Sequence, residues 1–303
     1  MVKRKRDTQK KTTALKVLNL NINKLFRYRF YLLLSLFFYT FSQAVFAQQE
    51  GSDKEIIFGV LPIISTEKLF ARFGPMADYL SKQIGQPIRL VTAVDFPTFK
   101  KRTESGKHYD FVFTAPHMYY SAQRKAGYKV IVRVAAPDMK AVIIVPKESE
   151  IKSLNDLKGK KLSTTAPVAL STLMIKAHLR KVGINPKKDL SLIYTPSHNA
   201  SLISTYKRVT DAGSLMLPPF KRAKKAIQSS VRILSLTDGV PHMPIAVAKS
   251  LNKATADKLK AALVELKLSD EGKALLKHLR WPGFAAAKPS EYDKLKWAVD
   301  ELK

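Results

Sequence analysis

Apolar residues along this chain form short continuous runs that alternate with segments of helical periodicity. Ile56–Leu61 is the first such run, and continuous rather than alternating hydrophobicity is typical of a strand covered on both faces. In residues 67–83 the apolar positions recur at intervals of three and four, which predicts a helix with one buried stripe. Further strands are predicted at 88–91, 110–113, 129–135, 141–145, 161–164, 190–194, 211–213, 231–236 and 245–247. Further helices are predicted at 96–104, 116–125, 169–181, 200–207, 220–227, 254–266, 269–279 and 290–302.

This alternation of strands and helices predicts an α/β fold. Two pairs of extended runs, 129–145 around Pro137 and 231–247 around Pro241, are interpreted as crossings between two lobes. We predict that each lobe is a mostly parallel sheet flanked by helices and that ligand binds at the carboxyl ends of the strands. Lobe one is predicted to comprise residues 48–138 and 243–303, and lobe two residues 139–242.

The first residues predict a secretory signal peptide over residues 1–47. Met1–Arg29 hold ten Lys and Arg and one Asp, Phe30–Phe41 is apolar, and the segment ends in Ala44-Val45-Phe46-Ala47. A basic start, an apolar stretch of about a dozen residues and a small-residue exit predict cleavage after Ala47. The alternative is an uncleaved membrane anchor, because Phe30–Ala47 approaches the length that spans a bilayer. The chain has no Cys, so it offers no lipid-attachment cysteine and no disulfide.

The chain is strongly basic, with 53 Lys and Arg against 24 Asp and Glu and a formal net charge of +29. Ten of the basic residues and one acidic residue lie in 1–47, which leaves 43 against 23, about +20, in the predicted mature chain. Such a field attracts anions, nucleic acid among them. Because the lysines are scattered and no nucleic-acid motif is present, we predict no nucleic-acid partner.

Hydroxyl groups stand where predicted strands pass into helices. Ser65, Thr114, Thr165, Ser171 and Thr172 occupy such positions, and Ser197-His198-Asn199 follows the strand at 190–194. Short hydroxyl donors, together with the unpaired backbone N–H groups of helix N-termini, suit tetrahedral oxyanions. Helix capping is the alternative for any single one of them. Their convergence on one edge of the sheet predicts a small-anion site.

Histidines and aromatic residues extend this candidate site. His117, His198 and His242 could each add a donor, and a neutral histidine within the cleft is the alternative. Phe96 and Tyr119 are candidates to line the cleft, and Asp211 could orient donors or bind an amino group of the ligand. The core and strand-end roles of these residues remain open.

No catalytic constellation is visible. The chain has no Cys nucleophile, no Gly-x-Ser-x-Gly, no His-Glu-x-x-His and no phosphate-cradling Gly-rich loop. Only six His are present, without metal-ligand spacing, so we predict a binding protein with no cofactor and no metal rather than an enzyme.

Six phrases, in order, resemble the phosphate/phosphite/phosphonate-binding proteins of ABC transporters, a branch of the type 2 periplasmic binding proteins. They are Phe58-Gly59-Val60-Leu61-Pro62, Asp110-Phe111-Val112-Phe113-Thr114-Ala115-Pro116, Asp156-Leu157-Lys158-Gly159-Lys160, Ser197-His198-Asn199-Ala200, Asp211-Ala212-Gly213 and Val240-Pro241-His242-Met243-Pro244. The resemblance covers nearly all of the chain after residue 47. It implies a monomeric periplasmic protein that captures an oxyanion between two lobes and delivers it to a permease in the inner membrane.

The family's ligand contacts carry over only in part. Its Ser-Thr-Ser-Gly element would fall at residues 169–172, where Ser171 keeps a hydroxyl while Ala169 and Leu170 do not. Phe96 stands where the family has Tyr, Thr114 stands where Tyr is frequent, and His198 matches the family's ligand-side His. Sulfur-containing anions, organophosphates and other small acids therefore remain alternatives to phosphonate. A sensing domain that signals to a membrane partner is the alternative to transport.

Overall fold

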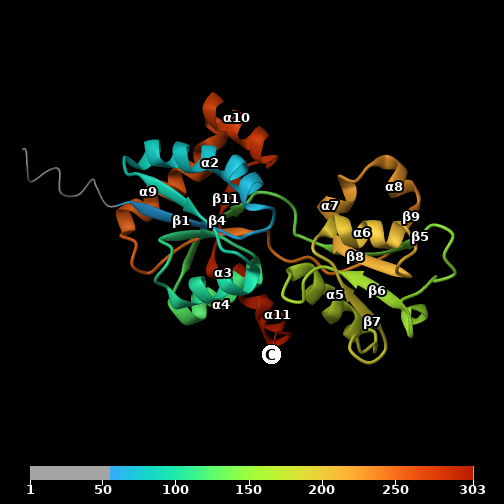
Figure 1. The fold of residues 1–303 in the computed structure, drawn as a ribbon. Coiled ribbons are helices and arrows are strands. Elements are labelled where there is room, and N and C mark those ends of the chain that lie inside the picture. Colours follow the sequence, from blue (N-terminus) through green and yellow to red (C-terminus); the bar gives the residue numbers. More distant parts are fainter. Residues whose placement is uncertain (1–54, 303) are drawn as a thin grey trace, which may run out of the picture. The chain divides into compact units, whose positions relative to one another are not determined.

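The computed structural model of the protein describes residues 55–302. The predicted signal peptide, residues 1–47, lies outside the described residues, so its cleavage stays a prediction. Within 55–302, none of the helices combines the length and the apolar content that crossing a bilayer needs. These residues form two β-sheets with helices packed against them (Figure 1).

The first sheet has six strands in the order β11-β4-β10-β3-β1-β2. They are β1 (Ile56–Val60), β2 (Ile88–Val91), β3 (Phe111–Phe113), β4 (Lys129–Val134), β10 (Pro244–Val247) and β11 (Phe284–Ala286). One face is covered by α2 (Thr66–Ile84), α9 (Lys253–Glu265) and α10 (Asp270–Leu279), with the 3-10 helix η2 (Leu266–Leu268) between the last two. The other face is covered by α3 (Phe96–Ser105) and α4 (Pro116–Ala126). Phe58 and Phe111 stack inside the first of these layers, with ring centroids 4.3 Å apart.

The second sheet has five strands in the order β7-β6-β8-β5-β9. They are β5 (Ala141–Pro146), β6 (Lys161–Thr164), β7 (Ser191–Tyr194), β8 (Ala212–Met216) and β9 (Val231–Leu236), and the 3-10 helix η1 (Asn155–Leu157) precedes β6. The helix α5 (Leu170–Lys181) packs on one face, while α6 (His198–Tyr206), α7 (Leu217–Lys221) and α8 (Lys225–Ser229) lie on the other side. Met174 of α5 and Leu202 of α6 belong to the two apolar layers.

Both sheets are mixed, which corrects the prediction of mostly parallel sheets. In the first sheet β1 pairs parallel with β2 and β3, whereas β10 and β11 pair antiparallel with their neighbours. In the second sheet β6 pairs parallel with β7 and β8, whereas β5 pairs antiparallel with β8 and β9. The reason is that β5 and β10 receive the chain from the other sheet. Each therefore begins where a neighbour ends, so that Ala141 pairs with Met216 and Ile245 with Phe113.

Two predicted helices differ in the structure, and one strand of the structure was not predicted. The helix predicted at 220–227 is broken into α7 and α8, and the Gln228 amide donates to the carbonyls of Lys221 and Ala223 at the break, at 3.2 and 2.6 Å. The helix predicted at 290–302 is a 3-10 helix, η3 (Pro289–Leu295), followed by the short α11 (Lys296–Asp300). The three-residue strand β11 was not predicted, because its position depends on pairing with β4 rather than on a pattern of its own.

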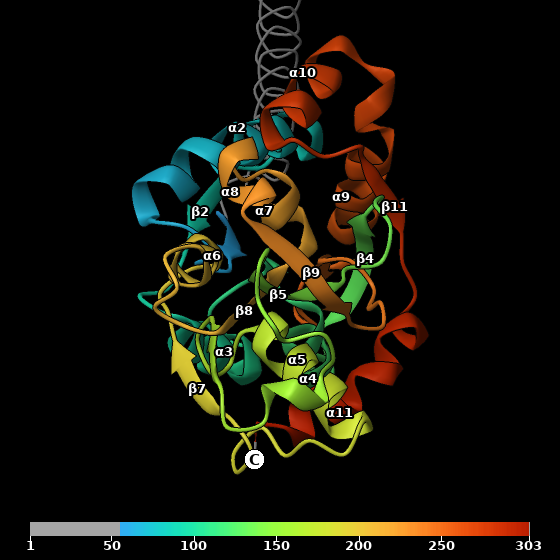
Figure 2. The ribbon, with the colours of Figure 1, turned by 90° about the vertical axis from the view of Figure 1, so that its right-hand side faces the viewer.

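The end of the chain connects the two sheets. After η3, whose Tyr292 is fully buried, α11 lies beside α5 in both ribbon views (Figures 1 and 2). Arg180 of α5 forms an ion pair with Glu301, and Trp297 packs against the core cluster that both sheets share. The last helix thus contacts α5, the helix that covers one face of the second sheet.

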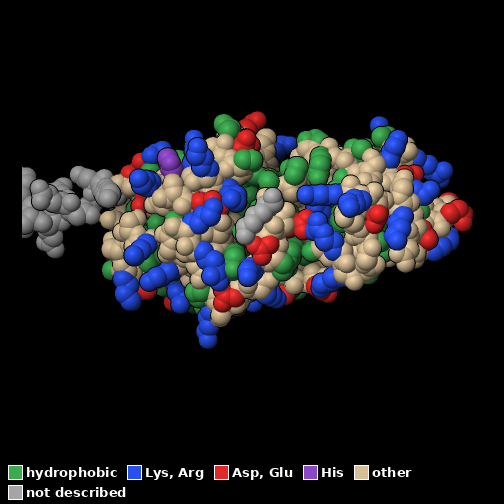
Figure 3. All heavy atoms as spheres, turned by 90° about the horizontal axis from the view of Figure 1, so that it is seen from below, with side chains coloured by type: hydrophobic (Ala, Val, Ile, Leu, Met, Phe, Trp, Pro, Cys, Tyr) green, Lys and Arg blue, Asp and Glu red, His purple; other side chains and the backbone are tan. Residues whose placement is uncertain are grey.

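Basic side chains are spread over the surface rather than gathered in one stripe. Figure 3 shows Lys and Arg side chains distributed along the face it presents, with Asp and Glu among them. Exposed ion pairs such as Lys82–Glu271 and Lys253–Asp257 contribute little stability, because water and salt screen them. Most of the positive charge therefore lies on solvated surface.

Candidate functional site

The carboxyl edges of both sheets lie beside the two segments in which the chain crosses between them, 135–140 and 237–243. An isolated antiparallel bridge joins these crossings, with backbone N···O distances of 2.8 and 3.0 Å between Met139 and Val240. Three predicted site residues follow strands at these edges: Thr114 follows β3, Thr165 follows β6, and His198 comes after β7. The fold therefore carries residues from both sheets toward the crossings.

Five buried hydroxyl groups form a connected hydrogen-bond network at the end of β6, which we call the hydroxyl cluster. Its members are Thr164, Thr165, Ser171, Thr172 and Ser214. Ser214 donates to Thr164 at 2.8 Å, Thr164 lies 2.8 Å from Thr172, and Thr172 donates to the carbonyl of Thr165 at 3.1 Å. Because a hydroxyl has one proton, these three donors are used inside the protein.

The Thr165 hydroxyl contacts two other hydroxyls, that of Ser171 at 2.7 Å and that of Thr172 at 3.2 Å. Because Thr172 donates to the Thr165 carbonyl, the protons of Thr165 and Ser171 serve these two contacts. The same place holds the first turn of α5, whose N-cap Ala169 makes no side-chain hydrogen bond to it. Unpaired backbone N–H groups of this turn thus lie beside the hydroxyl cluster, which favours an anion. Thr172 bonds to the Thr164 hydroxyl and to the Thr165 carbonyl, so its role is to hold these two residues in place.

Thr114 is fully buried, and its hydroxyl has no hydrogen-bond partner. Its backbone N–H donates to Pro244 at 3.2 Å, which holds the residue against β10. A buried hydroxyl without a partner costs about 1–3 kcal/mol. A polar ligand at this position would remove that cost.

His117, in the first turn of α4, contacts the loop between β6 and α5. Its Nε2 lies 3.2 Å from the carbonyl oxygen of Val168, so Nε2 carries the proton and Nδ1 is an acceptor. Nδ1 is buried without a partner. Burial lowers the pKa of His117 to about 4, so the ring is neutral near pH 7. A neutral imidazole here joins the two sheets without adding charge.

His198 is the first residue of α6 and is partly buried. The preceding Ser197 caps the helix by accepting from the N–H of Ala200 at 3.1 Å, as the capping alternative predicted. Burial and the nearby Arg222 lower the pKa of His198 to about 4, and its Nδ1 is buried without a partner. Thr195 donates to the carbonyl of Thr164 at 2.8 Å from both its N–H and its hydroxyl. That contact places the start of α6 next to the hydroxyl cluster.

Four further predicted residues lie around these elements. Ser65 is exposed at the N-terminus of α2, where it makes no side-chain cap, and Asn199 is exposed on α6. Phe96 is half-buried against the core at the start of α3. His242 uses Nδ1 to accept from the N–H of Met243 at 2.9 Å, and burial lowers its pKa to about 4. His242 therefore lies on a crossing, with its Nδ1 already bonded.

Two predicted residues do not join the others. Tyr119 is fully buried in the core, where its hydroxyl accepts from the N–H of Val130 at 3.1 Å and its ring lies edge-on to Tyr292. Asp211 precedes β8, and its carboxylate accepts from the N–H of Lys161, the first residue of β6, at 2.8 Å. It lies at the edge of the sheet opposite the hydroxyl cluster. Position thus corrects both predictions, since neither side chain reaches the carboxyl edges.

Sequence reasoning did not name Thr164 or Ser214 as site residues. Their hydroxyls meet because β6 and β8 are near neighbours in the sheet, although the two residues are 50 positions apart in the chain. A strand-end hydroxyl after β6 was a usable signal for Thr164. Ser214 lies inside a strand, and no local pattern distinguishes it from an ordinary strand residue.

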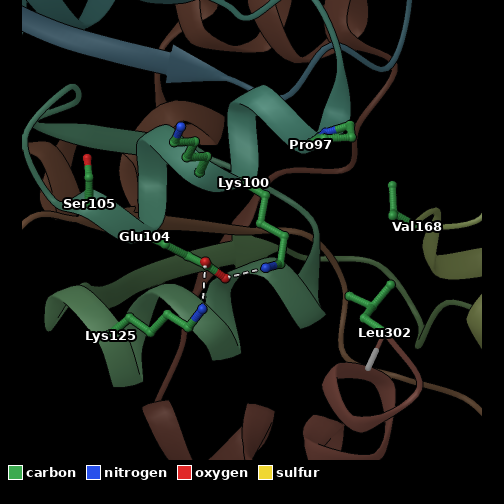
Figure 4. A pocket seen from close by; sticks show the side chains of 8 residues that line it. Pro97, Lys100, Glu104, Ser105, Lys125, Val168 and Leu302 are labelled. Atoms are coloured by element: carbon green, nitrogen blue, oxygen red, sulfur yellow. Dashed lines mark hydrogen bonds and ion pairs between the residues drawn. The ribbon is translucent and has the colours of Figure 1, made fainter.

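A separate pocket of about 460 Å³ lies between α3, α4 and the β6–α5 loop (Figure 4). Its lining residues are Pro97, Lys100, Lys101, Glu104, Ser105, Lys125, Val168 and Leu302. Glu104 pairs with Lys100 at 2.7 Å and with Lys125 at 2.8 Å, so part of the positive charge of the pocket is neutralised. None of the predicted site residues lines this pocket. Within the described part of the chain, no group of His, Cys, Asp and Glu has a metal-binding arrangement.

Comparison with known proteins identifies the family of the chain. The sequence model of the family described as "ABC transporter, phosphonate, periplasmic substrate-binding protein" matches residues 58–292. The phosphonates-binding periplasmic protein of Escherichia coli (strain K12) is 22% identical over 254 residues, which cover 80% of this chain and 75% of that protein.

Two solved structures share the fold. PhnD1 from Prochlorococcus marinus (MIT 9301), in complex with methylphosphonate, superposes with a TM-score of 0.73 at 19% identity over 82% of this chain and 98% of that one. A binding protein component of an ABC phosphonate transporter from Pseudomonas aeruginosa gives 0.71 at 17% identity over 83% and 87%. At these identities the likeness shows the fold alone.

Two helix-flanked sheets joined by paired crossings define a two-lobe type 2 periplasmic-binding-protein fold. Because the family model matches more than half of the chain, the chain belongs to the phosphonate family of periplasmic substrate-binding proteins of ABC transporters, which confirms the resemblance seen in the sequence.

Proposed function

We propose that this protein captures a small tetrahedral oxyanion, a phosphonate, phosphate or phosphite, in the periplasm and delivers it to an ABC transporter permease in the inner membrane. It acts as a monomer, without cofactor and without catalysis. The family and the relatives' ligands support this proposal. The protein's own contribution is a set of neutral donors at the carboxyl edges of both sheets.

The observation that carries the proposal is the buried, unpartnered hydroxyl of Thr114 together with the uncapped N–H groups in the first turn of α5. An oxyanion needs several hydrogen bonds and few countercharges, and these groups supply donors that the protein leaves unused. Ser65, Phe96, Asn199 and His242 belong to the proposed surroundings of the ligand.

The proposed motion is a hinge closure of two lobes, residues 48–138 with 243–303 and residues 139–242. The crossings support it, because the Met139–Val240 bridge holds the two crossing segments side by side. Gly239 in the second crossing lies close to Asp138 in the first. A Cβ atom added at Gly239 would be 2.8 Å from the Asp138 Cβ. A compact hinge of this kind lets the lobes rotate as bodies.

An anion panel tests the function. Purified protein is heated with methylphosphonate, phosphate, phosphite or sulfate in turn, and the unfolding temperature is recorded. A ligand present at 100 times its dissociation constant should add about 2.7 kcal/mol to the free energy of unfolding. A rise with at least one phosphorus oxyanion supports the proposal, and no rise with any of them contradicts it.

The variant Thr114→Val should bind the oxyanion about ten- to a hundredfold more weakly, because a hydrogen bond to a charged group is lost. The free variant should be as stable as the unmutated protein or more stable, since it no longer buries an unpartnered hydroxyl. Titration calorimetry and urea unfolding measure the two effects. Thr103→Val is the matched control: its buried hydroxyl bonds to Phe99 at 2.8 Å, and its binding should stay unchanged. Undiminished affinity of Thr114→Val would remove Thr114 from the site.

The variant His198→Ala should weaken the ligand-induced thermal shift. The imidazole lies at the start of α6 beside the hydroxyl cluster, and its buried Nδ1 has no partner in the protein. The panel is repeated with the ligand that shifts the unmutated protein most. A shift as large as in the unmutated protein would place His198 outside the site.

A further inference from the structure

Lys176, in the middle of α5, is a mostly buried lysine without a counter-ion. Only 7% of the residue is exposed, although a lysine is rarely buried unless it is paired. No carboxylate among residues 55–302 forms an ion pair with it, whereas Arg180 and Lys181 of the same helix are both paired. Its Nζ lies over the ring of Tyr194, 5.9 Å from the ring centroid, which is a cation–π contact.

The position of Tyr194 places this ammonium at the carboxyl edge of the second sheet. Tyr194 is the last residue of β7 and pairs in register with Thr164, the last residue of β6. Residues paired in this way point to the same face of a sheet, and the Thr164 hydroxyl lies 2.8 Å from that of Thr172 on α5. Tyr194 and the Lys176 Nζ above it are therefore on the face covered by α5, one strand away from the hydroxyl cluster.

The geometry of α5 directs the lysine toward the proposed anion site. Lys176 and Thr172 are four residues apart in the helix, so they are neighbours on one side of it. Helical side chains lean toward the N-terminus of their helix, so the long stem of Lys176 extends toward the first turn of α5. That turn holds the uncapped N–H groups beside which the oxyanion is proposed to bind.

The groups proposed so far to surround the oxyanion are neutral. Thr114 supplies a hydroxyl, and burial lowers the pKa of His117 and of His198 to about 4, so both rings are uncharged near pH 7. An anion that leaves water for such a site loses hydration without meeting a positive charge. The Lys176 ammonium, which can donate three hydrogen bonds, is likewise largely removed from water without a carboxylate partner. A contact between the two ions would offset both costs.

We propose that Lys176 is a ligand-binding residue, whose ammonium donates to the oxyanion and supplies the positive charge that the neutral donors lack. This inference rests on the proposed function, because the anion is the one held by Thr114 and the first turn of α5. It also specifies the ligand class. A doubly charged oxyanion, such as a phosphonate, gains more from this contact than a singly charged one, such as a sulfonate. The alternative is an ammonium that only reaches past Tyr194 into solvent.

The variant Lys176→Met tests the inference, because it removes the charge and keeps an unbranched apolar side chain. Methylphosphonate should bind to it about tenfold or more weakly than to the unmutated protein, because a hydrogen bond between charged groups is lost. The free variant should be as stable as the unmutated protein or more stable, since it no longer buries an unpaired ammonium. Titration calorimetry at one ionic strength and urea unfolding measure the two effects.

Two further variants serve as controls. Lys181→Met removes the same charge from the exposed last residue of α5, which pairs with Asp238, and should keep the affinity of the unmutated protein. Lys176→Arg keeps the charge and should bind methylphosphonate more tightly than Lys176→Met does. The unmutated protein should also bind methylphosphonate more tightly than the singly charged methanesulfonate, and Lys176→Met should narrow that difference several-fold.

The outcomes separate the two proposals. If Lys176→Met binds methylphosphonate as tightly as Lys181→Met does, or keeps the full difference between the two ligands, the ligand contact of Lys176 is refuted and the oxyanion site stands. The same conclusion follows if Lys176→Arg binds as weakly as Lys176→Met. If the folded, unmutated protein binds no phosphorus oxyanion, the proposed function fails, and this inference fails with it.

Discussion

Replacing Gly213 by Ala should lower the free energy of unfolding by about 2–3 kcal/mol, because overpacking a buried site forces neighbours to move. Gly213 lies in β8 beneath α6, and a Cβ there would sit 2.1 Å from the Thr205 hydroxyl oxygen and 3.1 Å from the Ser201 carbonyl oxygen. The backbone carbonyl cannot rotate away, so α6 must shift. Urea unfolding measures the change.

The same substitution should weaken oxyanion binding, since α6 carries His198 and the next residue, Ser214, belongs to the hydroxyl cluster. Gly74→Ala is the control, because a Cβ there has no atom within 4 Å. Its stability should change by no more than about 1 kcal/mol, as the gain in helix propensity is offset by the restriction that the following Pro75 imposes. A Gly213→Ala protein as stable as the Gly74→Ala protein would contradict the close packing of α6 on β8.

Stability should fall steeply as the pH drops from about 6.5 to 4, and His117 should account for a large share of the loss. The pKa of His117 is lowered from 6.5 to about 4 in the folded protein by burial. Below pH 6.5 the unfolded chain takes up a proton that the folded protein does not, so unfolding becomes more favourable. A lowering of this size corresponds to about 3 kcal/mol at the acid end of the range.

The variant His117→Gln isolates this contribution, because an amide can still donate to the carbonyl of Val168 but does not titrate. Urea unfolding at pH 7 and pH 4.5 should show a smaller difference for the variant than for the unmutated protein. His198 and His242, whose pKa values are also lowered to about 4, should leave part of the pH dependence in place. An equal pH dependence in His117→Gln would show that His117 is not buried as a neutral ring.

Local pattern predicted most of the elements, because their signals lie within a few consecutive residues. The apolar run at 56–61 became β1, and the three-and-four spacing at 67–83 became α2 with Leu69 and Phe73 in the core. Strand direction was predicted less well. Whether β10 runs with or against β3 depends on where the chain returns from the other sheet, which no stretch of residues records.

Some features of the candidate site could be predicted from the sequence, and others could not. Thr114, Thr165 and His198 could be named in advance, since a polar residue after a strand is a local feature. The absence of a partner for the Thr114 hydroxyl, the joining of Thr164 to Ser214, and the burial of Tyr119 could not, because each depends on residues far away in the chain.

The sequence by itself determined the class of fold, the family resemblance and the strand-end hydroxyls, because periodicity and short ordered phrases survive as local information. Only the tertiary structure decided which polar groups are left without a partner. Hydrogen bonds act between groups that are close in space, and the folding of the second sheet brings Thr164 and Ser214 together from distant parts of the chain, while the Thr114 hydroxyl stays unpaired.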